Sequence, residues 1–191
     1  MLGCRGVGGL ELKTRGSFTN TNALQHVNTQ MEDEPKKKIK ITDPHKGLEK
    51  GMSWCAYQER CQQEVRDKLY EWGLWPEAVE NIIAELITQN FLNEERFAQA
   101  YAGGKFRIKK WGRVKIKLEL KKRKISDYCI RKAMKEIDED DYRATLKKIL
   151  AEYSKKLKEK HTLKRKYRLV HYAQSRGFEQ ELIWDALADG N

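Results

Sequence analysis

One pattern of apolar residues occurs three times along the chain, each time around an apolar residue that follows a turn. The three central residues are Leu74, Ile125 and Phe178, which lie 51 and 53 residues apart. Apolar residues also stand five and nine positions before each of them, and five, eight and nine positions after. Such spacings place apolar side chains on one face of a helix. Three matches in register indicate an internal repeat.

The matching positions before the central residues are Val65 and Leu69, Ile116 and Leu120, and Leu169 and Ala173. Those after them are Val79, Ile82 and Ile83, then Ile130, Ala133 and Met134, then Ile183, Ala186 and Leu187. Each copy is therefore predicted to form a helix, one tight turn and a second helix.

The residues at the turns agree with this interpretation. Gly73 and Gly177 fit the left-handed position that ends a helix, and Lys124 occupies this place in the middle copy at some steric cost. Ser126 is expected to cap the helix that follows it, and Pro76 is expected in a first helical turn.

A further helix is predicted after each of the first two copies, one beginning near Asn93 and the other at the acidic run Asp138–Asp141. The predicted fold is all-α, with three tandem three-helix repeats that form an elongated curved array. We expect repeat 1 at 51–102, repeat 2 at 103–158 and a truncated repeat 3 at 159–191.

The segment 113–122 also fits a second interpretation. Val114, Ile116, Leu118 and Leu120 alternate with charged residues, which by itself indicates a strand. The repeat favours a helix, because the equivalent segments do not alternate. Such a helix has apolar residues on two sides, which suits a central unit packed between neighbours.

Residues 1–50 differ from the rest of the chain. They are rich in Gly, Thr, Asn and Lys and have few apolar residues, so we expect a disordered N-terminal tail. A true translation start at Met31, with 1–30 lying upstream of it, is consistent with the sequence. Met1 to Asn20 lacks the apolar core of a secretory signal.

Composition and charge exclude several classes of protein. No apolar run approaches the ~20 residues that cross a bilayer, and four cysteines in 191 residues exclude a disulfide-stapled scaffold. The net charge is +11, but it is concentrated: residues 103–135 have a net charge of +12, residues 146–176 have +9, and acidic segments separate them. These blocks predict a basic surface on one side of the protein that binds a polyanion. The alternative is that the charged residues only form solvated helix faces.

The sequence gives little support for catalysis. The histidines and cysteines do not have the spacing of a zinc site, and Gly103-Gly104-Lys105 fails the phosphate-loop pattern because Gln99 stands at the position of the first glycine. The run Asp138–Asp141 suits either a helix N-terminus, which we favour, or a divalent cation. We therefore expect no enzyme activity, no cofactor and no metal.

Binding to nucleic acid is better supported, because basic residues with aromatic residues between them suit a phosphate backbone and stacked bases. Trp111 is a candidate for base stacking, whereas Phe106 is expected to pack between repeats. The predicted binding residues are Lys105, Arg107, Lys109, Lys110, Trp111, Arg113, Lys115, Lys122, Lys155, Lys156, Lys164 and Arg165.

Two stretches of the chain, Phe91 to Ala98 and Phe106 to Arg113, are followed by Ile116, Leu120 and Ile125. In this order and spacing they resemble the RecX family of bacterial recombinase regulators. Cys61 to Leu74 is similar to the first repeat of the family, and Ser175 to Phe178 is similar to the third. The resemblance covers about 52–190. Lys124 departs from the glycine usual in the second repeat.

The resemblance implies an all-helical, cytoplasmic protein that is not an enzyme. It implies binding to the RecA recombinase filament and to single-stranded and double-stranded DNA, with inhibition of RecA's ATPase, strand-exchange and coprotease activities. Capping of the filament and insertion into its groove are both consistent with this. The alternative is a basic helical-repeat protein that binds DNA without a recombinase partner. We expect a monomer without a membrane partner.

Overall fold

The structure is a computed structural model that describes residues 40–188. In this range the chain forms nine helices and no strand. Their bounds are α1 (Pro44–Tyr57), α2 (Gln62–Trp72), α3 (Pro76–Thr88), α4 (Glu94–Lys109), α5 (Arg113–Lys122), α6 (Asp127–Lys135), α7 (Glu139–Lys156), α8 (Thr162–Arg176) and α9 (Gln180–Ala188). None of the described helices is long and apolar enough to cross a membrane.

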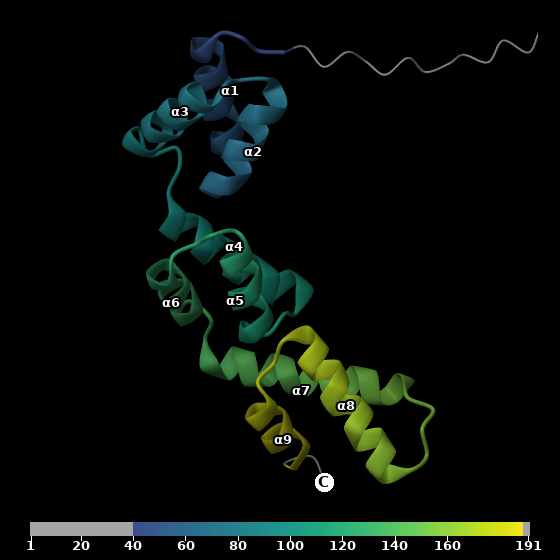
Figure 1. The fold of residues 1–191 in the computed structure, drawn as a ribbon. Coiled ribbons are helices and arrows are strands. Elements are labelled where there is room, and N and C mark those ends of the chain that lie inside the picture. The colour runs from purple at the N-terminus through teal and green to yellow at the C-terminus, as the bar shows by residue number, and fades with distance from the viewer. Residues whose placement is uncertain (1–39, 189–191) are drawn as a thin grey trace, which may run out of the picture. The chain divides into compact units, whose positions relative to one another are not determined.

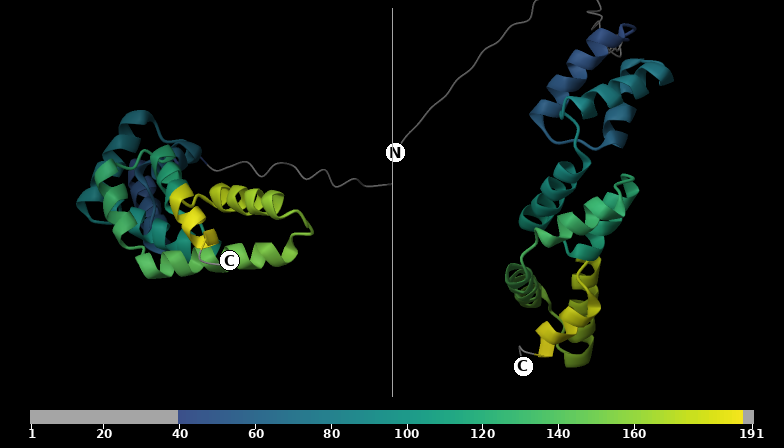
Figure 2. Two further views of the ribbon diagram at one scale, coloured as in Figure 1. Left: turned by 90° about the horizontal axis from the view of Figure 1, so that it is seen from below. Right: turned by 90° about the vertical axis from the view of Figure 1, so that its left-hand side faces the viewer.

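The helices pack in three groups of three (Figures 1 and 2). The first group is α1–α3, the second is α4–α6 and the third is α7–α9, and within each group every helix contacts the other two. The predicted all-α array of helical repeats is therefore confirmed.

The predicted repeat boundaries need correction. The boundary expected at residue 102 falls inside α4, and the third group is not truncated, because α7 is its first helix. The longer helix of each group precedes the two helices joined by the repeated turn. The repeated apolar pattern covers only those two helices. It therefore does not show whether the third helix of a group precedes them or follows them in the chain.

The first helix lies partly in the segment expected to be disordered. It begins at Pro44, and the side chain of Asp43 caps it by accepting a hydrogen bond from the backbone N–H of His45 at 2.9 Å. Gly47 and Gly51 are buried against Leu74 and Leu86 of the first group. The helix packs through glycines, so a count of apolar residues underestimates its buried surface. Residues 1–39 lie outside the described part of the chain.

The three turns at the centre of the repeat have the same backbone conformation. Gly73, Lys124 and Gly177 have φ values of 99°, 58° and 88°, in the left-handed region. The following residue in each copy donates its N–H to a carbonyl five residues earlier, at 3.2–3.3 Å. Lysine thus adopts the conformation that glycine adopts in the other copies. The three central apolar residues are all buried.

The segment 113–122 is a helix, α5, which confirms the repeat over the alternating pattern. Ile116 and Leu120 are fully buried. The expected burial of its second apolar side is wrong, because Val114 is 52% exposed and Leu118 is 53% exposed. Neighbouring groups cover only one side of this helix.

The described residues form two hydrophobic cores. One lies within the first group, around Val65, Leu69 and Leu86. The other is shared by α4–α9, so the second and third groups have a common core around Tyr142. Phe106 belongs to the shared core, as expected, with its ring centroid 5.7 Å from that of Tyr142.

The beginning of α5 packs end to end against the end of α8. Gly112 donates its N–H to the carbonyl of Arg176 at 2.8 Å, and Val114 donates to the carbonyl of Gly177 at 3.0 Å. The ends of a helix leave backbone N–H and C=O groups without partners inside the helix. Here N–H groups at the beginning of α5 donate to C=O groups at the end of α8. We call this contact the helix-end junction. A Cβ on Gly112 would lie 2.1 Å from the carbonyl oxygen of Gly177, so only glycine fits.

Candidate functional site

The predicted binding residues lie on α4, on the link between α4 and α5, and on α5, α7 and α8. Lys105, Arg107 and Lys109 are on the last turns of α4, and Lys110 and Trp111 lie in the link to α5. Arg113, Lys115 and Lys122 are on α5, Lys155 and Lys156 end α7, and Lys164 and Arg165 are in the first turn of α8. The structure brings some of them together and turns others inward.

Trp111 is half-buried and packs against the shared core. The Nζ atoms of Lys105 and Lys115 lie 5.3 and 4.7 Å from its ring centroid. A cation at such distances is attracted to the ring face. Lys115 is also half-buried and donates from Nζ to the carbonyl of Ser175 at 3.3 Å. Two lysines of the protein itself therefore lie close to the Trp111 ring. Base stacking on Trp111 stays a prediction.

Arg113 is held by contacts inside the protein. Its guanidinium donates to the carboxylate of Glu139 at 2.7 Å and to the carbonyl of Ile137 at 3.2 Å, and it lies 4.2 Å from the ring centroid of Tyr142. Its side chain is only 17% exposed. These contacts join α5 to the beginning of α7, so the structure gives Arg113 a packing role.

The Arg113–Glu139 pair predicts a small sensitivity to acid. The hydrogen bond from Arg113 lowers the pKa of Glu139. A carboxylate with a lowered folded-state pKa contributes stability above its unfolded pKa, and this is lost as pH falls through the folded pKa. Because Glu139 is half exposed, Glu139→Gln is expected to cost under about 1 kcal/mol at pH 7. Urea unfolding should show this difference at pH 7 and lose it below about pH 4. An equal difference in stability between wild type and Glu139→Gln at both pH values would contradict the stabilising role of the Arg113–Glu139 pair.

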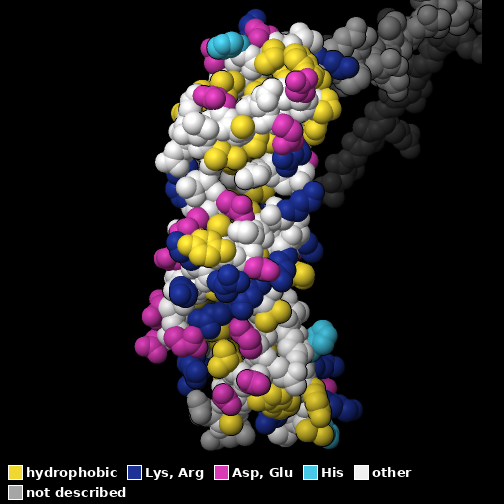
Figure 3. Space-filling view, turned by 60° about the vertical axis from the view of Figure 1, so that its left-hand side comes forward, with side chains coloured by type: hydrophobic (Ala, Val, Ile, Leu, Met, Phe, Trp, Pro, Cys, Tyr) yellow, Lys and Arg dark blue, Asp and Glu magenta, His cyan; other side chains and the backbone are white. Residues whose placement is uncertain are grey.

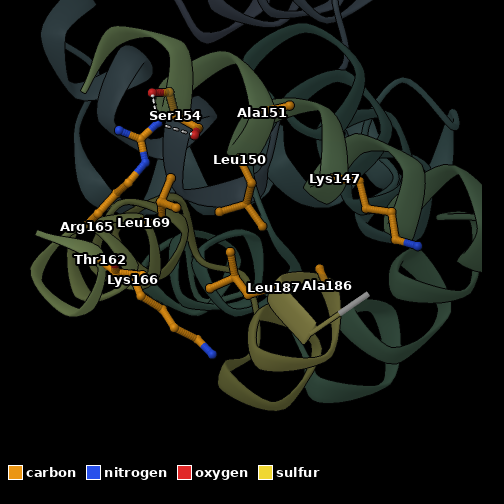
Figure 4. Close-up of a pocket in the computed structure, with 10 residues that line it drawn as sticks. All are labelled: Lys147, Leu150, Ala151, Ser154, Thr162, Arg165, Lys166, Leu169, Ala186 and Leu187. Carbon is orange, nitrogen blue, oxygen red and sulfur yellow. Dashed lines mark hydrogen bonds between the residues drawn. The ribbon is translucent and has the colours of Figure 1, made fainter. Parts of the chain in front are cut away.

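Arg165 likewise closes the link between α7 and α8. Its guanidinium donates to the carbonyl and hydroxyl oxygens of Ser154 at 2.6 and 2.7 Å, and to the carbonyl of Leu157 at 3.1 Å. Figure 4 shows the two bonds to Ser154 at the edge of a cavity in the third group. The cavity has a volume of about 400 Å³ and an apolar floor that includes Leu150, Leu169 and Leu187.

A groove between α5 and α6 is lined mainly by basic residues. Its walls carry Lys117 and Lys121 from α5 and Arg131 and Lys135 from α6, and its volume is about 360 Å³. The apolar floor is formed by Ile130 and Met134, with Asp127 at the rim. We call it the α5–α6 groove. Figure 3 shows Lys and Arg side chains gathered over the second group on the side of α6.

None of the four cations of this groove is among the predicted binding residues. A signal for them exists: Lys117 and Lys121 are four residues apart, and so are Arg131 and Lys135, which places each pair on one face of its helix. The four exposed residues then meet because the repeated turn brings α5 and α6 together. Of the predicted residues, Lys122 lies nearby on α5, 61% exposed, and pairs with Glu119 at 2.8 Å.

The described residues offer little for catalysis. They contain no group of three or more His, Cys, Asp and Glu side chains that could hold a metal ion. Asp138 caps α7 by accepting from the N–H of Asp141 at 2.9 Å, which supports the helix N-terminus over a cation site. Burial raises the pKa of Cys55 to about 11 and also raises that of Cys61. Both thiols stay protonated at neutral pH and are poor nucleophiles.

Comparisons with known proteins agree with this architecture. Two family models match the chain: the first three-helix domain of RecX over residues 48–86, and the second over residues 93–134. The first match begins within α1 and ends within α3, and the second begins at the N-cap of α4 and ends within α6, in agreement with the observed groups.

Curated relatives named "Regulatory protein RecX" match most of the chain. The protein from Pelodictyon phaeoclathratiforme is 30% identical over 128 residues, which are 66% of this chain and 77% of the relative. The protein from Lactobacillus johnsonii is 27% identical over 159 residues, or 83% of this chain. The chain spans 58% of the length of that relative and 64% of the one from Prosthecochloris aestuarii.

Solved structures share the fold. The crystal structure of RecX from Lactobacillus salivarius matches with a TM-score of 0.69 and 20% identity, covering 76% of this chain and 95% of that one. A second crystal structure of regulatory protein RecX matches with a TM-score of 0.68 and 19% identity, covering 73% and 68%. At this identity the likeness concerns the fold alone.

Proposed function

The chain belongs to the RecX family of regulatory proteins, and we propose that it binds the RecA filament on DNA and inhibits its ATPase, strand-exchange and coprotease activities. Family membership is the observation that carries the proposal. The protein acts as a cytoplasmic monomer, without catalysis, cofactor or metal of its own.

The α5–α6 groove supports a polyanionic component of the binding site. Lys117, Lys121, Arg131 and Lys135 place four cations around one hollow. Of these, Lys121 lies 3.4 Å from Asp127, and both side chains are more than 60% exposed, so the pair is weak. Phosphates that enter the groove release condensed counterions, which makes binding favourable and dependent on salt.

The proposal is tested with RecA hydrolysing ATP on single-stranded DNA. Protein added at a substoichiometric ratio to RecA is expected to reduce the rate of hydrolysis. Helical circular dichroism of the same sample shows that the protein is folded. A folded sample that leaves the rate unchanged would overturn the proposed regulation of RecA.

A second candidate function is a DNA-binding helical array that needs no recombinase. The observation that favours it is the α5–α6 groove, since a row of cations is sufficient for binding to phosphates. This function predicts tight DNA binding together with an unchanged RecA ATPase rate. The RecA experiment therefore separates the two candidates.

Reversal of the groove charges is expected to weaken DNA binding strongly. With Lys117, Lys121, Arg131 and Lys135 changed to Glu, we expect the affinity for single-stranded DNA to fall by at least a hundredfold. Each phosphate contact contributes about 0.7 to the slope of log K against log salt, so the slope should fall by about 3. Fluorescence anisotropy at several salt concentrations measures both quantities.

A matched variant controls for net charge. Lys155, Lys156, Lys158 and Lys164 are exposed residues of the third group, and their change to Glu alters the total charge equally. We expect a smaller loss of affinity and a smaller change of slope. Equal losses for the two variants would show that binding follows net charge and does not depend on the groove.

A further inference from the structure

The outer face of α5 carries apolar residues that no other described segment covers. Val114 and Leu118 are four residues apart, on one face of the helix, and each has about half of its surface exposed. The opposite face carries Ile116 and Leu120, which are fully buried. We call the exposed pair the α5 stripe.

Lysines border the α5 stripe on both sides. A helix turns by about 100° per residue, which places Lys117 and Lys121 on one side of the stripe and Lys115 and Lys122 on the other. Lys121 and Lys122 are each 61% exposed. An apolar centre with a charged rim is the arrangement found in many protein interfaces.

We propose that the α5 stripe docks a partner protein through apolar side chains flanked by carboxylates. This inference rests on the proposed function and deepens it: the partner surface is an acid-rimmed apolar patch of a RecA protomer. The neighbouring α5–α6 groove contacts phosphates. Lys117 and Lys121 lie on the edge that the groove and the stripe share, so the basic block of residues 103–135 contacts both ligands.

Charge and chemistry favour this occupant over two others. A second copy of the chain would bring two lysine-bordered faces together, and like charges repel. A nucleic-acid backbone would bring phosphates against Val114 and Leu118, which have no donors for them, and the phosphates would lose water without compensation. An apolar patch with an acidic rim would cover Val114 and Leu118 with apolar groups and would place carboxylates beside the bordering lysines.

The experiment compares RecA inhibition with DNA binding in a Val114→Ser, Leu118→Ser double variant. Both positions are exposed, so the helical content should stay unchanged, as circular dichroism will show. Burial of two half-exposed aliphatic side chains contributes enough for roughly a tenfold change in affinity. We expect the concentration that half-inhibits RecA ATPase to rise about tenfold, with the affinity for free DNA unchanged within about twofold.

A matched control carries the same chemical change elsewhere. Ile87 of α3 is 44% exposed and Leu163 of α8 is 57% exposed, and Ile87→Ser, Leu163→Ser should leave both readouts unchanged. Equal loss of inhibition in this control would overturn the assignment to α5. Parallel loss of DNA binding and inhibition in the α5 variant would make nucleic acid the occupant, and unchanged inhibition would also overturn the inference. A wild-type protein that fails to inhibit RecA overturns the proposed function itself.

Discussion

Replacement of Gly112 by alanine is expected to lower the free energy of unfolding by roughly 3 kcal/mol or more. The added Cβ would lie 2.1 Å from the carbonyl oxygen of Gly177 and 2.4 Å from the backbone nitrogen of Phe178. Both atoms belong to backbone, so no side-chain rotation relieves the overlap. The helix-end junction must open, and its two hydrogen bonds are lost or lengthened.

Urea denaturation measures this loss, and a second glycine provides the control. Gly104 lies within α4, and a Cβ placed there meets nothing within 4 Å. Because alanine favours a helix over glycine by about 1 kcal/mol, Gly104→Ala should preserve or raise stability. Equal stability of Gly112→Ala and wild type would show that the helix-end junction is not formed as described.

Truncation of Tyr142 to alanine is expected to destabilise the protein by about 3–5 kcal/mol. Tyr142 is fully buried, and its ring centroid lies 4.9 Å from that of Phe178 and 5.7 Å from that of Phe106. Alanine would leave a cavity where helices of the second and third groups meet.

The hydroxyl of Tyr142 has a separate role, which Tyr142→Phe isolates. It accepts from the backbone N–H of Arg113 at 3.0 Å and donates to the carboxylate of Glu179 at 2.6 Å. Burial and the Glu179 contact hold its pKa above the usual range. Loss of the hydroxyl leaves two polar groups without a partner and should cost about 1–3 kcal/mol. Tyr57 is 86% exposed, so Tyr57→Phe should have no effect. Chemical denaturation of the three variants tests this, and a neutral Tyr142→Phe would refute the role of the hydroxyl.

Apolar spacing predicted the helices and the repeated turn well, because both depend on residues near in sequence. The pattern around Leu74, Ile125 and Phe178 was sufficient to predict α5 as a helix despite its alternation. It was not sufficient to assign α4 and α7 to a group, because that depends on packing between distant segments. It also missed the start of α1, where Gly47 and Gly51 bury surface without large apolar side chains.

The sequence shows which segments carry the basic residues, but it does not show which of these residues lie together on the surface. The charge of residues 103–135 directed attention to the segment that contains the α5–α6 groove. Whether a given cation faces solvent depends on its neighbours in space: Arg113 meets Glu139, and Arg165 meets Ser154. Neither contact is visible in the spacing of residues. Lys117, Lys121, Arg131 and Lys135 come together only when two helices pack.

The separation of the two hydrophobic cores has a consequence for the way the molecule opens. The core of α1–α3 is distinct from the core shared by α4–α9, so the first group can unfold locally while the rest stays folded. Such opening must break the ion pairs of Arg96 with Glu59 and of Arg123 with Glu64, and must withdraw Cys61 from the shared core. Amide hydrogens of α2 should then exchange with solvent at a lower free energy than those of α7.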